Sequence, residues 1–302
     1  MSFKLEQLRL LFKVFENFEN WYDILFVRCG LKKVADIRLK RVPLHLKIEG
    51  EDWIVPLHIA KILTEGSLST SNSNILLRFK NLKFLLHDLK TDIPCIYETF
   101  VERMYDKFSF KDKVILDIGA YIGDTAIFFA VKGAKKVIAC EPNPLIFNIL
   151  NKNVKVNNLE KVIITLNIAV GVDRFMEFFI SSYMPGSTLF EEKFHVKNYT
   201  ALNQKVQKKL IVKSISIKRL LDQIGSIDIL KMDCEGCEFL ILKDLVEQCI
   251  SDRIREGIML EIHQFGKEFN YHRAISLLKS SGFKKGFIRR ISRTHYFAWA
   301  YK

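Results

Sequence analysis

The feature that most constrains the fold of this 302-residue chain is a regular alternation of apolar runs and helical segments after about residue 96. Apolar runs at 114–117, 136–141, 162–170, 227–233 and 258–262 are typical of strands buried on both faces of a parallel sheet. This alternation predicts an α/β, Rossmann-like, doubly wound sheet with right-handed crossovers. Two closing strands, at about 284–290 and 295–301, predict a C-terminal antiparallel hairpin and a mainly parallel sheet of seven strands.

The stretch 175–217 interrupts this rhythm. Strand-like runs at 176–180 and 211–215 flank a long basic loop. Long loops in compact domains are usually functional or disordered. We expect the segment from Gly186 through Lys209 to form a lid or an acceptor-binding wall, with a disordered loop as the alternative.

Residues 1–95 predict a small accessory region of helix and β-hairpin, before a main domain at 96–302. The first 31 residues have apolar side chains at helical spacing, which predicts a helix packed on its own domain or, alternatively, on a membrane surface or a partner. Residues 44–48 and 53–55 predict a hairpin with Gly50 in its turn. The Ser- and Thr-rich stretch 64–74 predicts a loop.

Composition narrows the class of protein. Lys and Arg number 47 against 34 Asp and Glu, a net charge of +13 that favours anionic partners such as RNA, acidic lipid headgroups or phosphorylated sugars. A solvated basic face without a dedicated ligand is the alternative. No apolar run reaches the roughly 18 residues of a membrane span, and the first residues lack signal-peptide features, so we expect a cytoplasmic protein. Six scattered cysteines are too few for a disulfide scaffold.

A glycine loop follows the first strand of the main domain. In an open α/β sheet, ligands bind beyond the carboxyl ends of the strands, where the strand order reverses. Gly119 allows a sharp turn with the backbone close to a ligand, and Gly123 relieves crowding where a helix begins. The N-terminus of that helix offers free N–H groups to a carboxylate. The pattern lacks the three glycines of dinucleotide sites and the Gly-Lys-Ser/Thr of phosphate loops.

Glu141 ends the second strand, 24 residues after Asp117. An acidic side chain there can accept hydrogen bonds from both hydroxyls of a ribose. Pro142 ends the strand, which places Asn143 beside the expected pocket. An NAD-like site or an empty sheet is the alternative.

Three motifs together resemble the FkbM family of methyltransferases: Val114–Ala126, Gly133–Pro144 and Ile229–Glu238. The resemblance runs from about residue 96 to the end, and it implies a class I methyltransferase fold that uses S-adenosyl-L-methionine. It also implies that Asp117, Gly119 and Gly123 hold the methionine end, that Glu141 holds the ribose, and that Asn167 and Ala169 border the adenine. Tyr121 departs from the usual Asn. The candidate cofactor-binding residues are Asp117, Gly119, Ala120, Tyr121, Gly123, Asp124, Thr125, Glu141, Pro142, Asn143, Asn167, Ala169 and Asp233.

The acceptor side is expected after the fourth and fifth strands. Asp233 and Glu235 are candidates for the cofactor ammonium or the acceptor hydroxyl. His263 is a candidate general base, and orienting a neighbouring carboxylate is its alternative role. Glu261 is another candidate base, or a partner of Lys231. Cys234 and Cys237 lack the second pair of a structural zinc site, and we predict no metal.

The family resemblance implies O-methylation of a hydroxyl on a sugar, glycolipid or other small molecule as the function. The basic, aromatic C-terminal stretch leaves an RNA methyltransferase as the alternative. A catalytically inactive S-adenosylmethionine-binding or scaffold protein is the third. No transmembrane segment is expected, and peripheral membrane contact stays open.

Overall fold

A computed structural model describes residues 12–40, 45–49, 54–71, 74–182, 184–190, 205–265, 268–283, 285–292 and 295–302. The chain forms two compact units, Met1–Met104 and Tyr105–Lys302. The predicted boundary at 95/96 falls inside helix α4 (Leu89–Phe100), which belongs to the first unit. No helix in these described ranges has the length and apolarity to cross a bilayer.

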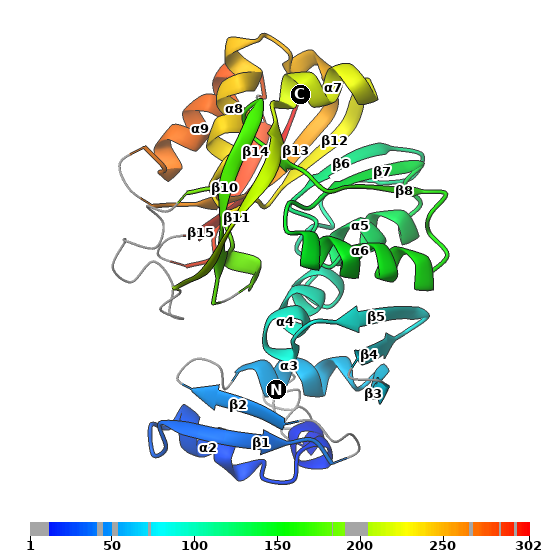
Figure 1. Ribbon diagram of the computed structural model, residues 1–302, viewed down its shortest axis with the longest axis vertical. Coiled ribbons are helices and arrows are strands. Elements are labelled where there is room, and N and C mark those ends of the chain that lie inside the picture. Colours follow the sequence, from blue (N-terminus) through cyan, green and yellow to red (C-terminus); the bar gives the residue numbers. More distant parts are fainter. Residues whose placement is uncertain are drawn as a thin grey trace. The chain divides into compact units, whose positions relative to one another are not determined.

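The first unit combines short helices with two small antiparallel sheets (Figure 1). Its elements before α4 are α2 (Tyr22–Arg28), β1 (Val34–Arg38), β2 (His45–Glu49), α3 (Val55–Ile62), β3 (Gly66–Ser71), β4 (Asn74–Phe79) and β5 (Leu82–Leu86). Strand β1 pairs with β2, and β3, β4 and β5 form a three-stranded meander. The region is therefore larger than the predicted helix and hairpin.

Two predictions for this unit are wrong. The hairpin partner of β2 is the preceding β1. Within the predicted second strand, 53–55, residue 53 lies outside the described residues, and Val55 starts α3 with Pro56 in its first turn. Proline fits a first helical turn, where its missing N–H is not needed. The stretch 64–74 holds β3 and the start of β4, because pairing with β4 and burial of Leu68 override its loop-like composition.

The expected N-terminal helix lies largely outside the described residues, and so does the Gly50 turn. Within them, residues 12–17 are helical. Phe18 is buried, whereas Phe12 and Phe15 are exposed. The predicted stripe is thus only partly packed in the described part.

The second unit is built on the predicted seven-stranded sheet, whose order is β14-β15-β13-β12-β6-β7-β8. The strands are β6 (Val114–Ile118), β7 (Lys136–Cys140), β8 (Ile163–Leu166), β12 (Ile227–Met232), β13 (Ile254–His263), β14 (Lys285–Arg290) and β15 (His295–Tyr301). Strands β8, β7, β6, β12 and β13 are parallel, and β15 and β14 are antiparallel. The mainly parallel sheet with a closing hairpin is confirmed.

Helices cover both faces of this sheet. They are α5 (Asp124–Val131), α6 (Pro144–Val156), α7 (Ile217–Ile224), α8 (Cys237–Glu247) and α9 (Tyr271–Ser280), with 3₁₀ turns at Met184–Gly186 and Ser251–Arg253. The chain runs from β6 outward to β8, then returns to β12 on the other side of β6. Right-handed crossovers in these opposite directions put α5 and α6 on one face and α8 on the other, and Figure 1 shows the two groups apart. The strand order thus reverses between β6 and β12, where ligand sites of such sheets lie.

The interrupting segment forms a second sheet of order β10-β11-β9, from β9 (Ala169–Val170), β10 (Arg174–Ser181) and β11 (Val206–Ile215). The two predicted strands are confirmed and are longer than expected. Part of the basic loop between them, 191–204, lies outside the described residues.

Candidate active site

The Gly119 turn packs directly on the end of the neighbouring strand. Gly119 has a φ of +77°, and a Cβ there would lie 1.8 Å from the carbonyl oxygen of Asp233. The N–H groups of Gly119 and Ala120 both donate to the carbonyl of Cys140. Glycine is therefore required both by its backbone conformation and by the close approach of Asp233.

Asp117 lies at the end of β6 and is fully buried. Its carboxylate accepts a hydrogen bond from Thr125 Oγ1 at 2.6 Å and pairs with Lys231 Nζ at 3.0 Å. Lys231, also buried, donates to the Gly119 carbonyl at 2.8 Å. Burial lowers the pKa of Lys231, but the charges of Asp117 and Asp233 outweigh it and raise the pKa above its usual range. Asp117 therefore stabilises the loop through Thr125 and Lys231. Lys231 pairs with Asp117, and not with Glu261, the partner that the sequence suggested.

Glu141 is buried at the end of β7, with both carboxylate oxygens accepting backbone hydrogen bonds. Oε2 accepts from Tyr121 N at 3.1 Å and Oε1 from Asn143 N at 2.8 Å. Burial raises the pKa of this carboxyl to about 8, although the two N–H donors and Lys231 oppose the rise. A carboxylate has about four acceptor positions, so two remain for other donors.

Tyr121, Pro142, Asn143 and Asn167, of the other predicted cofactor residues, lie close to Glu141. Tyr121 has a φ of +47°, a left-handed conformation that Asn tolerates better than Tyr. Asn143 caps α6 through its bond from Leu145 N, and Asn167 donates to the carbonyls of Glu141 and Pro142. Ala169 is buried in β9.

The first turn of α5 completes the loop. Gly123 caps the helix with a φ of +92°, and a Cβ there would meet Leu150. Asp124 and Thr125 follow it and are buried. The sequence-predicted loop residues are thus gathered at one end of β6 and β7.

A second group of side chains gathers around His263, at the end of β13. His263 Nδ1 lies 2.5 Å from Glu238 Oε1, and Nε2 faces Glu235 Oε2 at 3.4 Å and Asp233 Oδ1 at 3.8 Å. His263 and Glu238 are buried, Glu235 is mostly buried, and Asp233 is 30% exposed. Glu238 is held in turn by the N–H of Gly236.

The charges around His263 dominate its protonation. Burial lowers the pKa of His263, but the carboxylates of Glu235, Glu238 and Glu261 outweigh burial and raise the pKa to about 10. These carboxylates favour a positive charge on or beside the imidazole. This environment favours its role as an orienting group over that of a free base.

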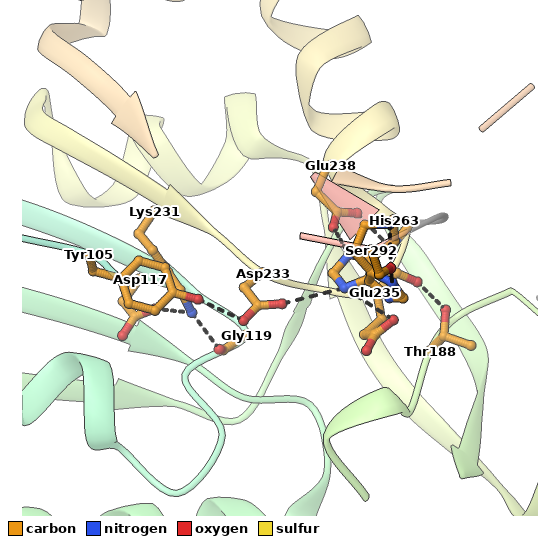
Figure 2. Close-up of polar contacts among 12 residues, drawn as sticks. Tyr105, Asp117, Gly119, Thr188, Lys231, Asp233, Glu235, Glu238, His263 and Ser292 are labelled. Carbon is orange, nitrogen blue, oxygen red and sulfur yellow. Dashed lines mark hydrogen bonds and ion pairs between the residues drawn. The ribbon is translucent and has the colours of Figure 1, made fainter. Parts of the chain in front are cut away.

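Asp233 joins the two groups (Figure 2). Its N–H donates to the carbonyl of Ile118, and its own carbonyl packs against Gly119. Its Oδ2 accepts a hydrogen bond from the Tyr105 hydroxyl at 2.9 Å. Its Oδ1 faces His263. The Gly119 turn and the acidic cluster therefore meet at one residue.

The segment Gly186–Leu189 packs against the Asp233 motif, residues Asp233–Glu238. Thr188 Oγ1 donates to the carbonyl of Glu235 at 2.5 Å, and Thr188 is buried. A Cβ on Gly236 would lie within 3 Å of Phe190 and Phe265. Gly236 is therefore required by these aromatic rings and by its φ of +114°.

Sequence reasoning missed Lys231, Glu238 and Tyr105 as members of this site. A lysine inside an otherwise apolar, buried strand was the available signal for Lys231, because such a charge needs a partner.

Cys234 and Cys237 are free thiols, and burial raises the pKa of Cys234 well above its usual range. This does not favour a reactive redox pair.

The Methyltransferase FkbM domain model matches residues 117–285, more than half of the chain. The chain belongs to the FkbM methyltransferase family. The matched range begins at Asp117 and contains Glu141, Asp233 and His263. The predicted family is confirmed, and the seven-stranded sheet of this FkbM methyltransferase has the class I methyltransferase fold.

Other matches are more distant. A 62-residue stretch is 37% identical to "Uncharacterized protein 158B" of Sulfolobus islandicus rod-shaped virus 1, spanning 20% of this chain and only 39% of that relative. M. jannaschii TYW2 in complex with AdoMet has a TM-score of 0.40 and 14% identity over 78% of this chain and 85% of that one. Precorrin-6y C5,15-methyltransferase from Geobacter metallireducens GS-15 has a TM-score of 0.37 and 13% identity over 67% and 86%. Similarity at this level carries no information about the acceptor.

Proposed function

We propose that this FkbM methyltransferase uses S-adenosyl-L-methionine to methylate a hydroxyl group on a sugar, glycolipid or other small molecule. The observation that carries the proposal is the acidic cluster beside the Gly119 turn, in which Asp233 and Glu235 face His263. A hydroxyl must lose its proton as it accepts a methyl group, whereas a neutral amine can react through its free electron pair. Acid–base groups at this position therefore suit a hydroxyl acceptor.

The residues of the loop fit an adenosyl ligand. Glu141 keeps two acceptor positions after its bonds from Tyr121 N and Asn143 N, which matches the two donors of a ribose diol. The first turn of α5 offers N–H groups to a carboxylate. The matching of acceptors to donors, at the point where the strand order reverses, supports the cofactor assignment.

When bound, S-adenosyl-L-methionine supplies an electrophilic methyl group on a sulfonium. The chain has to hold the acceptor oxygen in line with the carbon–sulfur bond and to receive a proton. The carboxylate of Asp233 or Glu235 would receive the proton that the acceptor hydroxyl loses when it takes up this methyl group. Glu238 fixes the ring of His263, which orients both carboxylates.

The cofactor is tested by calorimetric titration of the full chain with S-adenosyl-L-methionine and S-adenosylhomocysteine. Glu141→Ala should weaken binding more than tenfold, because two hydrogen bonds to a charged acceptor are lost, at about 1.5–3 kcal/mol each. Glu177→Ala, on the exposed side of β10, is the matched control and should bind as the wild type. Equal affinity in all three proteins would refute the ribose assignment.

The acceptor class is tested with methyl-labelled cofactor and two panels, glycans with polyols and RNA transcripts. A methyl ether on a hydroxyl survives alkali, whereas a methyl ester does not, so alkali-stable label on the first panel supports the proposal. The RNA alternative is favoured by one observation, the exposed Phe287 stacked on Trp299 with Lys107 5.0 Å from that ring. Label on RNA alone would favour it, and cofactor binding without transfer would favour an inactive binding protein.

A further inference from the structure

The side chains around His263 have the donor types and the spacing of a metal site. His263 Nε2 lies 3.4 Å from Glu235 Oε2 and 3.8 Å from Asp233 Oδ1. Both distances exceed the 2.7–2.9 Å of a charge-assisted hydrogen bond. Two ligands about 2.1 Å from one ion lie about 3.0 Å apart at a right angle and about 3.4 Å apart at a tetrahedral angle. The 3.4 Å gap to Glu235 therefore matches two ligands of one ion at a tetrahedral angle, the 3.8 Å gap to Asp233 corresponds to a wider angle of about 130°, and neither gap matches a direct bond.

The other ring nitrogen shows the arrangement that orients metal-binding histidines. Nδ1 is bonded to Glu238, a fully buried carboxylate that also accepts from the Gly236 N–H. A carboxylate on one ring nitrogen fixes the ring and directs the other nitrogen to a metal. This contact is independent of the carboxylates on the Nε2 side, and it leaves Nε2 directed at them.

Two further donors lie at the edge of the cluster. Ligand atoms of Glu235, His263 and His295 all lie within 4.8 Å of one another, and so do those of Asp233, Glu261 and His263. The ring of His295 stands edge-on to His263 at 5.0 Å, with its Nδ1 2.9 Å from Ser292 Oγ. His263 belongs to both sets, which centres the site on its Nε2.

Charge favours a cation at the same point. Four carboxylates, those of Asp233, Glu235, Glu238 and Glu261, surround one imidazole, and two of them are mostly or fully buried. Buried carboxylates are costly unless a cation compensates them. Asp233 is 30% exposed, against 12% for Glu235 and 2% for His263, so an ion would keep an open side on the side of Asp233, as metals that bind substrates do.

We propose that His263, Glu235 and Asp233 bind one divalent first-row transition-metal ion, with His295 and Glu261 as additional ligands. The sequence predicted no metal, because these ligands come from different strand ends and have no spacing motif. Imidazole with carboxylates suits Mn²⁺, Fe²⁺, Co²⁺ or Zn²⁺, whereas Mg²⁺ and Ca²⁺ prefer oxygen ligands alone.

The role of the ion, but not its site, rests on the proposed function. An ion beside the acceptor would lower the pKa of its hydroxyl. The proton would then pass to water on the open side, and Asp233 and Glu235 would serve as ligands. An acceptor with two neighbouring oxygen atoms, such as a vicinal diol, would bind such an ion best.

The site is tested with Mn²⁺ on EDTA-treated full-length protein, without cofactor, by loss of the free-ion paramagnetic resonance signal. Mn²⁺ is preferred because Cys29 and Cys249 are exposed thiols that attract softer ions. We expect about one ion per chain. Glu235→Gln and His263→Gln should each weaken binding at least a hundredfold, and Glu238→Gln, through ring orientation, about 10- to 100-fold.

Two exposed residues supply matched controls, His272→Gln on α9 and Glu247→Gln on the outer side of α8, and both should bind Mn²⁺ as the wild type. S-adenosylhomocysteine binding in each variant reports that the domain is folded. No Mn²⁺ binding by the wild type, or equal binding in Glu235→Gln and His263→Gln, overturns the metal site. Metal binding without S-adenosylhomocysteine binding would refute the cofactor assignment and leave the metal site standing.

Discussion

The contact between Gly119 and the Asp233 carbonyl gives the sharpest test of how the Gly119 turn, the proposed cofactor site, is held. In Gly119→Ala the added Cβ would start 1.8 Å from that oxygen, and real contacts of this kind are not below 3.0 Å. The loop or the Asp233 motif must therefore move by 3.0 − 1.8, about 1.2 Å. A displacement of about 1 Å in a binding loop can cost about a hundredfold in function.

The same change also costs stability, for two reasons. An L-residue with left-handed φ costs about 1–2 kcal/mol, and overpacking adds about 1–3 kcal/mol. The sum, about 2–5 kcal/mol, corresponds to a fall in Tm of roughly 4–20 °C for a domain of this size. Gly282→Ala measures the cost of the left-handed backbone without the overpacking, because Gly282 has a φ of +86° and no atom lies within 4 Å of a Cβ added there.

The assay is calorimetric titration with S-adenosylhomocysteine at a temperature where both variants are folded. Gly119→Ala should raise Kd at least tenfold, whereas Gly282→Ala should lower Tm by about 2–8 °C and leave Kd within twofold. If Gly119→Ala binds within threefold of the wild type, the turn is not set by Asp233 and the reasoning fails.

Three further expectations concern Glu141, Lys231 and Tyr105. Ribose hydroxyls donate to the ionised form of Glu141, whose pKa is about 8, so Kd for S-adenosylhomocysteine should fall about tenfold per pH unit up to pH 8 and then level off. Glu141→Gln should flatten this profile, and a flat wild-type profile would contradict the idea. Lys231→Met leaves buried Asp117 without its cation and should cost about 3–5 kcal/mol in urea unfolding. Tyr105→Phe removes the bond to Asp233 and should lower kcat/KM for the acceptor about tenfold, with cofactor Kd unchanged.

Each of the last two changes has a control in the same domain. Lys243→Met breaks only an exposed pair with Glu247 and should cost less than about 0.5 kcal/mol. A loss as small for Lys231→Met would refute the bracing role of that lysine. Tyr301→Phe removes a phenol bond to a backbone carbonyl, that of Lys107, and should leave kcat/KM unchanged. Equal effects of the two tyrosine changes would contradict a specific role for Tyr105.

The central sheet was predictable because strands buried on both faces leave a continuous apolar signal. β12 is buried at every position and is surrounded by helical segments, so its type and place follow from its sequence. The first unit lacks such a signal. There β3 is a Ser- and Thr-rich edge strand whose formation depends on pairing with β4. Helix α3 has a proline, Pro56, in its first turn, and a proline is equally common in turns.

The site was predictable only where one strand end was enough to define it. Asp117, Glu141 and Asp233 each follow an apolar run, so their common location follows from the parallel sheet. The pairing of Lys231 with Asp117 and of Glu238 with His263 depends on register between elements far apart in the chain. Register of that kind is set by packing in three dimensions and leaves no spacing pattern in the sequence.

Asp233 gives a physical reason for the two halves of the site to act together. Its carbonyl leaves no room for a Cβ at Gly119, its Oδ2 accepts a hydrogen bond from the phenol of Tyr105, and its Oδ1 faces His263. Any ligand that shifts the Gly119 turn must therefore shift a carboxylate of the acidic cluster, and the reverse also holds. Because coupling between two binding events is reciprocal, a cofactor that favours one position of Asp233 favours the acceptor-side arrangement that shares it. Under the proposed function, methyl transfer needs donor and acceptor aligned at the same moment, and a residue that contacts both the Gly119 turn and the acidic cluster can couple their positions.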